Sequence, residues 1–258
     1  MSPDQRQADS VILELYEGST TVPFSQFQQW ALARLQKLIH YDAAWWGKAS
    51  GEPPRILRVH TDCASDTILD DYQGVIDEDY FRDAMLAEPG RTFNLADLSS
   101  RDDYLRSALY LRYGRRHRIE HMIGTVRVES DTSMLEFLSV WRFDARWPFS
   151  ERDRLLKEQL MPHLVEAYRI NRLVSLRRAM AGELNLEGAF AWALVGTDDA
   201  CFIEANSACL HLIRQEWPAW HGAIAPEPIH KHLKRCRPFK GERIMIDISD
   251  VDGYRLLV

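Results

Sequence analysis

The chain has 258 residues and a formal net charge of −6 at pH 7, with 46% hydrophobic and 27% charged residues. This length suggests two domains or one large one, the composition is ordinary for a globular protein, and the acidic balance argues against a nucleic-acid surface over the whole chain. The four cysteines form no CxxC pair, the N-terminus has no apolar signal core, and no apolar run approaches the ~20 residues of a membrane span, so we expect a cytoplasmic protein.

The first part of the chain predicts two helices followed by two strands. Residues 11–16 predict a short helix that ends at Gly18. Residues 24–39 carry apolar side chains at helical spacing and predict an amphipathic helix. Residues 42–47 and 55–61 then predict two strands separated by a turn.

The middle of the chain is less regular. Residues 66–83 hold seven acidic residues opposed only by Arg82. Ser99 or Ser100 is expected to cap a helix that Gly114 ends, with arginines near its C-terminus, where the helix dipole favours cations.

A hairpin and a long helix follow. Residues 122–128 and 134–143 predict two strands that pair across a turn at 129–132. Ser150 and Asp153 can cap the next helix reciprocally. That helix is predicted over residues 151–178, which is far longer than an average helix of ~11 residues.

Beyond residue 181 a second, smaller unit repeats this alternation. Its expected elements are strands at 188–195 and 201–204, helices at 205–216 and 228–236, and a hairpin of 242–248 with 254–258 across Asp252-Gly253. The predicted class is therefore α+β: an antiparallel sheet with flanking helices, a long connecting helix and a second α+β unit.

Six short motifs give the chain a resemblance to a known family. They are Tyr41–Gly47, Phe137–Arg142, Phe149–Arg154, Pro162–Ala167, Phe202–Asn206 and Trp217–Trp220. With them residues 1–180 resemble a GAF domain, and residues 181–258 resemble a PAS domain more weakly. Together they resemble the N-terminal sensor region of bacterial LuxR-type helix-turn-helix transcriptional regulators.

The resemblance implies a ligand-sensing region that controls an attached DNA-binding domain through dimer geometry. This chain stops at Val258 within an apolar strand and lacks that helix-turn-helix domain. We expect a shortened form of a longer protein, the alternative being a sensor-only protein. DNA would be reached only through the missing domain, and no membrane partner is expected. The pattern of the lactone-binding members does not align here, so no lactone is predicted.

The resemblance also implies a pocket for an unidentified, partly apolar small molecule. The residues expected to line it are Trp45, Trp46, Tyr104, Tyr110, Tyr113 and Trp141. Ordinary core packing explains any one of them equally well. Because adjacent strand residues point to opposite faces, one of Trp45 and Trp46 should point away.

Other constellations give no catalytic or metal site. They are His117 with His121, His232 with Cys236 in the basic run 228–237, and His60 with Asp62 and Cys63. Structural zinc usually needs four ligands, and neighbouring strand residues do not form a catalytic dyad. No phosphate loop, HExxH or GxSxG motif occurs, so we predict no metal, no cofactor and no enzyme. The basic run could contact phosphates, although no aromatic residues interleave with it.

The long helix carries a coiled-coil-like seam that predicts a homodimer. Its members are Leu156, Leu160, His163, Ala167, Ile170 and Val174, with an irregularity at His163 and a proline at 162. A helix packed on its own sheet would give the same pattern. Two other functions stay open: a dimerisation scaffold without a ligand, and an unrecognised enzyme.

Overall fold

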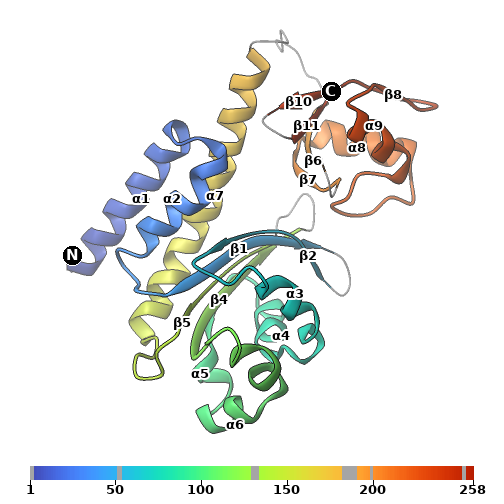
Figure 1. The fold of residues 1–258 in the computed structure, drawn as a ribbon. Coiled ribbons are helices and arrows are strands. Elements are labelled where there is room, and N and C mark those ends of the chain that lie inside the picture. Colours follow the sequence, from blue (N-terminus) through green and yellow to red (C-terminus); the bar gives the residue numbers. More distant parts are fainter. Residues whose placement is uncertain (1–2, 51–53, 129–133, 182–190, 198–199, 252–253) are drawn as a thin grey trace. The chain divides into compact units, whose positions relative to one another are not determined.

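Two compact units make up the chain in a computed structural model, which describes residues 3–50, 54–128, 134–181, 191–197, 200–251 and 254–258 (Figure 1). Unit 1 ends at Asn171, and unit 2 consists mainly of residues 172–258. Each unit contains its own sheet with helices packed on it, so the predicted α+β class is confirmed.

The sheet of unit 1 has five strands in the order β2-β1-β5-β4-β3. Their bounds are β1 Ala43–Ser50, β2 Arg55–Asp62, β3 Thr92–Asn94, β4 His121–Val128 and β5 Leu135–Arg142. β5 pairs antiparallel with β1 and β4, with Trp141 opposite both Ala43 and Met122. The predicted β4–β5 hairpin is confirmed, although its turn lies outside the described residues.

Helices cover both faces of this sheet. One face lies against α1 (Pro3–Thr21), α2 (Phe24–Leu35) and α7 (Glu151–Ala181), and the other against α3 to α6 (Figure 1). The bounds of the second layer are α3 Ile68–Gln73, the 3-10 turn η1 Ile76–Glu78, α4 Tyr80–Ala87, α5 Leu95–Leu98, α6 Arg101–Arg106 and the π-helical turn η2 Tyr110–Gly114.

The first helix is longer than predicted and runs through Gly18. A Cβ atom on Gly18 would lie 2.2 Å from the indole of Trp30 on α2. The glycine therefore does not end α1. It allows the Trp30 ring to approach the α1 backbone closely.

The prediction of a single helix ending at Gly114 was wrong, because the helix is interrupted at Ser107. Ser100 caps α6 by accepting a hydrogen bond from the Asp103 amide at 3.2 Å, as predicted. The Ser107 hydroxyl then donates to the Tyr104 carbonyl at 2.7 Å and accepts from the Tyr110 amide at 3.1 Å. These local bonds compete with helical ones, a behaviour typical of serine.

The predicted start of α7 is confirmed by a reciprocal capping box. The Ser150 amide donates to the Asp153 carboxylate at 3.0 Å, and the Asp153 amide donates to the Ser150 hydroxyl at 3.2 Å. The helix continues through Pro162 and ends at Ala181, three residues later than predicted. Among the described residues, no helix is both long and apolar enough to cross a membrane.

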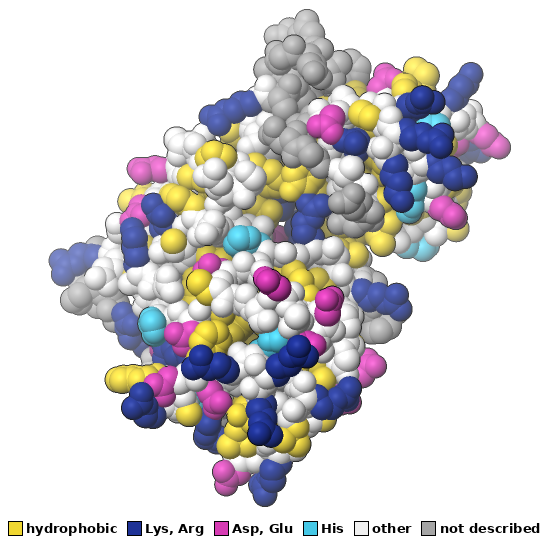
Figure 2. Space-filling model, viewed as in Figure 1, with side chains coloured by type: hydrophobic (Ala, Val, Ile, Leu, Met, Phe, Trp, Pro, Cys, Tyr) yellow, Lys and Arg dark blue, Asp and Glu magenta, His cyan; other side chains and the backbone are white. Residues whose placement is uncertain are grey.

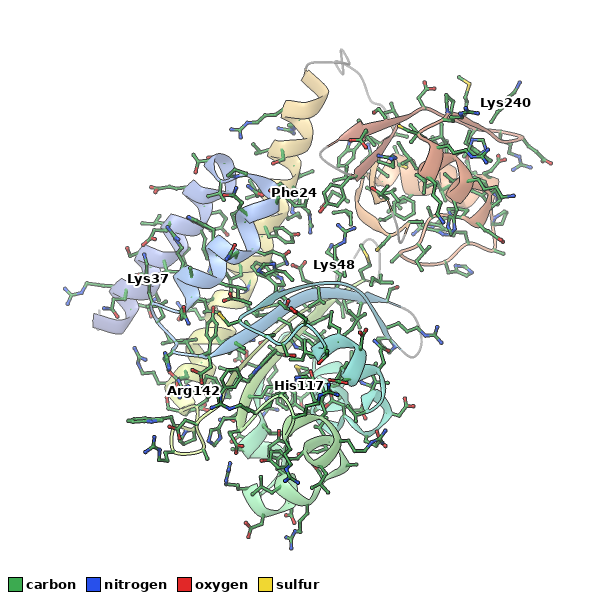
Figure 3. All side chains as sticks on the ribbon, viewed as in Figure 1. Phe24, Lys37, Lys48, His117, Arg142 and Lys240 are labelled. Atoms are coloured by element: carbon green, nitrogen blue, oxygen red, sulfur yellow. The ribbon has the colours of Figure 1, made fainter. Side chains whose placement is uncertain are left out.

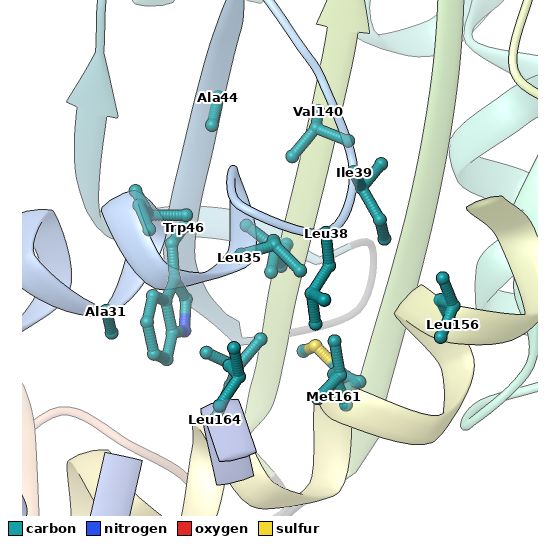
Figure 4. Close-up of a cluster of buried hydrophobic side chains, with 14 of the residues drawn as sticks. Ala31, Leu35, Leu38, Ile39, Ala44, Trp46, Val140, Leu156, Met161 and Leu164 are labelled. Carbon is teal, nitrogen blue, oxygen red and sulfur yellow. The ribbon is translucent and has the colours of Figure 1, made fainter. Parts of the chain in front are cut away.

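The main core of unit 1 lies between the sheet and the layer of α1, α2 and α7 (Figure 4). Trp46, Leu35 and Met161 are almost completely buried there. Leu156, Leu160 and Ala167 of the predicted dimer seam belong to this core, so they are not free to form an interface. Further along α7, Ile170 and Val174 are only partly buried.

Unit 2 contains a four-stranded sheet in the order β10-β11-β6-β7 and a separate two-stranded sheet, β8-β9. The bounds are β6 Ala193–Gly196, β7 Phe202–Ala205, α8 Ser207–Glu216, α9 Glu227–Arg235, β8 Phe239–Lys240, β9 Met245–Ile246, β10 Ile248–Val251 and β11 Tyr254–Leu257. The predicted strand 242–248 is divided, because β9 pairs with β8 while β10 pairs with β11. Residues 188–190 and the Asp252-Gly253 turn lie outside the described residues.

A lysine amine is buried within unit 1. Lys157 of α7 is fully buried, and its Nζ donates to the Thr125 hydroxyl of β4 at 2.7 Å. The Thr125 hydroxyl also lies 2.6 Å from that of Thr92. Burial holds the pKa of Lys157 well below its ordinary value of 10.5. The amine therefore favours the neutral form in the folded chain.

We expect Lys157→Met to raise the melting temperature at pH 7. The unfolded chain protonates Lys157 below pH 10.5, whereas the folded chain resists protonation, so the native lysine opposes folding as the pH falls. The gain should be a few degrees, at ~2–4 °C for each kcal/mol in a protein of this size, and should shrink toward pH 10.5. Calorimetry from pH 6 to 10.5 tests this, with Lys37→Met at an exposed position just after α2 as the control. A uniform loss of stability at every pH would contradict it.

Candidate functional site

Aromatic rings fill the face of the unit 1 sheet that lies against α3 to α6. Trp45 of β1 and Trp141 of β5 point to this face, with ring centroids 5.7 Å apart. The Trp45 ring also contacts Tyr72 of α3 at 5.0 Å and Phe137 of β5 at 6.1 Å, all in edge-on geometry. Edge-on contacts between aromatic rings stabilise a fold by more than the burial of their apolar surface alone. The wall of the site is thus made of touching rings.

A carboxylate is buried beside these rings. Asp79 is 5% exposed and caps α4, with its Oδ1 accepting the amides of Phe81 and Arg82 at 3.1 Å each. The Tyr72 hydroxyl donates to its Oδ2 at 2.6 Å. Burial raises the pKa of Asp79, although these donors lower it in part. The group is a hydrogen-bond acceptor whose charge the surroundings resist.

Tyr113 brings a buried hydroxyl to the same cluster. Its ring lies 5.5 Å from that of Tyr72 and 4.8 Å from that of His117. The hydroxyl oxygen is buried and has no hydrogen-bond partner among the residues that the structure describes. Burial raises the pKa of Tyr113, and the Asp79 charge raises it further. An unpartnered buried hydroxyl costs ~1–3 kcal/mol, so this side chain favours any polar atom that reaches it.

Polar contacts hold the 110–117 segment, which includes η2, onto α3 and η1. Arg112 donates to Glu78 at 2.6 Å and to the Gly74 carbonyl at 2.5 Å. Asp71 of α3 accepts from Arg116 at 2.7 Å and lies 2.9 Å from the ring of His117. Figure 3 labels His117 within this second helical layer. The segment that carries Tyr113 is therefore fixed by side chains on its outer side.

The predicted pocket residues do not all lie together. Trp45, Trp141, Tyr104 and Tyr113 belong to the aromatic face. Trp46 points to the opposite face, where its ring lies tilted against that of Tyr168 with centroids 5.3 Å apart and its indole N–H donates to Glu136 at 2.8 Å. This confirms that the two tryptophans point apart, and it removes Trp46 from the candidate site.

The two remaining tyrosines have partners of their own. The buried Tyr104 hydroxyl donates to the Ile119 carbonyl at 2.7 Å. Tyr110 lies at the rim, where its hydroxyl donates to Glu120 at 3.1 Å. That the aromatic residues bind a ligand stays a prediction.

Sequence reasoning missed the two residues that give the site its polarity, Tyr72 and Asp79. Both lie in the acidic segment 66–83, where most carboxylates are exposed. The available signal was local, because Asp79 precedes the apolar positions of α4 as an N-cap residue does. Its burial depends on the sheet and could not be seen locally.

Other reactive side chains are held in unreactive settings. The charge of Asp62 raises the pKa of the exposed Cys63 thiol, which is the reverse of activation. His121 contacts the Ala145 carbonyl at 3.0 Å, and His232 contacts that of Pro238 at 2.7 Å. In the part of the chain that the structure describes, no three His, Cys, Asp or Glu side chains are grouped to hold a metal ion.

No family model matches this chain, and no curated protein matches it. Solved structures are similar at low identity. The VqsR LBD domain from Pseudomonas aeruginosa is 17% identical over 64% of this chain and 96% of its own, with a TM-score of 0.48. Escherichia coli SdiA is 17% identical over 70% of this chain and 71% of its own, also at 0.48. A GAF domain of a phosphoenolpyruvate-protein phosphotransferase from Coxiella burnetii is 12% identical over 70% and 99%, at 0.39. Such scores establish neither a family nor a function for this chain.

The two buried tyrosines should respond in opposite ways to loss of the hydroxyl. Tyr113→Phe removes an unpartnered group, so the free energy of unfolding should stay equal or rise by about 1 kcal/mol. Tyr104→Phe removes the bond to Ile119 and should lower it by about 1 kcal/mol. Urea unfolding of both variants measures the difference. Equal losses would show that the Tyr113 hydroxyl already has a partner.

Proposed function

We propose that this chain is the ligand-sensing region of a LuxR-type transcriptional regulator, with the small molecule bound on the aromatic face of unit 1. The observation that carries the proposal is the unpartnered Tyr113 hydroxyl in the cluster of the buried Asp79 carboxylate. A hydroxyl and a carboxylate with apolar surroundings are the few polar groups that orient a small ligand. The link to a DNA-binding domain rests on the sequence resemblance.

The chemistry of the walls defines the ligand class. Trp45, Trp141 and Phe137 offer apolar and aromatic surface. A ligand atom that accepts a hydrogen bond would give the Tyr113 hydroxyl a partner. A ligand atom that donates one would bind the Asp79 carboxylate. We therefore propose a partly apolar molecule with both an acceptor and a donor.

Ligand entry requires a rearrangement, because the rings of the site contact one another. The 110–117 segment is the element proposed to move. It ends the second helical layer and includes a π-helical turn. Two of its contacts, Arg112–Glu78 and Arg116–Asp71, are arginine ion pairs near the surface that contribute only ~0–1 kcal/mol each, and the third is the buried contact of His117 with Asp71. Displacing it would expose Tyr113 and the rings behind it. A ligand that binds the displaced form better would shift the population toward that form.

A regulatory role fits these groups better than catalysis. Asp79 is held by Tyr72 and two backbone amides, so it is a poorly placed proton acceptor. A scaffold without ligand is the second candidate, and the contacts of Trp45 with three other rings favour it. Ligand-dependent stabilisation separates the two candidates.

A thermal-shift screen of partly apolar metabolites should find compounds that stabilise the chain. At a hundred times the dissociation constant the gain is ~2.7 kcal/mol, or about 5–10 °C. Asp79→Asn keeps an oxygen for the α4 cap but removes the charge, and it should reduce this shift strongly. Asp97→Asn at an exposed position of α5 is the matched control and should keep it.

Two results would contradict the proposal. A wild-type chain that no compound stabilises would favour the scaffold. An equal shift in wild type and Asp79→Asn would place the ligand elsewhere.

We also propose a homodimer through the later part of α7, where Ile170 and Val174 remain partly exposed. Replacing both with Asp would place charges in an apolar interface, so light scattering should report a monomer. Gln159→Asp on an exposed position of the same helix is the control and should leave the mass unchanged. A double variant that keeps the dimer mass and the native circular dichroism would exclude this interface.

A further inference from the structure

A concentrated basic surface lies on unit 2, although the chain as a whole is acidic. Residues 227–243 contain six Lys and Arg residues against Glu227 and Glu242. Five of them are exposed and define the α9 basic surface: Lys231, Lys234, Arg235, Arg237 and Lys240. Figure 2 shows Lys and Arg side chains gathered on this part of unit 2, and Figure 3 labels Lys240 on β8.

Within the described ranges, the cations of the α9 basic surface are not neutralised by other side chains. None of the five side chains has an ion-pair or hydrogen-bond partner among the residues described, whereas most arginines of unit 1 do. Like charges close together on a helix repel one another and oppose folding. Among the residues described, no ion pair or side-chain hydrogen bond offsets this repulsion.

The stability of α9 explains the positions of only two of these five cations. Lys234 and Arg235 lie in the last turn of α9, where the helix dipole favours cations. Lys231 lies outside the last turn, and Arg237 and Lys240 follow the helix after Cys236. Cys236 ends α9 in the left-handed αL conformation, with φ of 48°. The chain changes direction there and then forms β8.

We propose that the α9 basic surface binds the sugar-phosphate backbone of nucleic acid. Arg and Lys side chains are the principal phosphate contacts in such complexes, and they act without reading sequence. The inference is independent of ligand sensing, because it concerns unit 2 alone. It is compatible with the acidic net charge, because five Lys and Arg residues are concentrated within residues 231–240.

Two other anionic partners fit the surface less well. An amphipathic helix enters a lipid interface by its apolar face, but the apolar residues of α9, Ile229 and Leu233, are buried in the unit 2 core at 0% and 1% exposure. Protein interfaces are depleted in lysine and are built around aromatic anchors. The α9 basic surface consists of charged side chains, three of them lysines.

The test uses residues 1–258 and a fluorescent 24-base-pair duplex of random sequence. Anisotropy should detect binding at 20–50 mM salt. If four phosphates are contacted, the affinity should fall roughly 100-fold between 50 and 200 mM salt, because the logarithmic slope is about −0.9 for each contact. The triple variant Lys231→Gln, Lys234→Gln, Arg235→Gln should reduce this slope by about 2–3.

A matched triple variant removes the same charge from exposed positions of unit 1: Lys37→Gln, Arg106→Gln and Arg115→Gln. It should keep the wild-type slope. All substituted side chains are exposed, and circular dichroism confirms folding. The proposal is overturned by no duplex binding at 20 mM salt, by equal loss in both triple variants, or by binding only to vesicles containing 30% phosphatidylserine.

Discussion

Burial of the unit 1 sheet on both faces is the constraint on which the rest of the structure depends. Because side chains alternate along a strand, β1 directs Trp46 toward α2 and α7 and Trp45 toward α3 to α6. The first face is a largely aliphatic core that anchors α7. The second face is aromatic and is covered by short helices joined by turns. One strand thus separates the structural side of the unit from the side proposed to bind a ligand.

Each face also contains a buried ionisable group that resists its charged form. Burial lowers the pKa of Lys157 on the α7 side and raises that of Asp79 on the other. Lys157 is oriented by one hydroxyl on a neighbouring strand, whereas Asp79 is oriented by its own helix and Tyr72. Beside Asp79, however, the Tyr113 hydroxyl has no hydrogen-bond partner in the described part of the chain. Buried polar atoms without a hydrogen-bond partner among the described residues occur on both sides of the sheet, because Asn171 Oδ1 on α7 has none either.

Local chemistry allowed the sequence to predict elements, and long-range packing limited the prediction of the site. The Ser150–Asp153 cap of α7 depends on four consecutive residues, so it could be predicted. The α7 seam could not be assigned, because Leu156 and Leu160 have the same spacing whether they meet a sheet or a second helix. Asp79 was missed because its burial depends on strands far away in the sequence. Trp45 and Trp141 could be proposed, since aromatic strand residues need an apolar face.

The length of α7 gives its attachment a geometric consequence. The helix has 31 residues and therefore extends ~46 Å, while its core contacts with the sheet end near Tyr168. It acts as a lever arm with a buried base. About 13 residues lie beyond Tyr168, a span of ~20 Å at 1.5 Å per residue, so a tilt of about 5° at that base would move the far end by ~2 Å. A small repacking under Trp46 would thus be transmitted along α7 to positions beyond its core contacts.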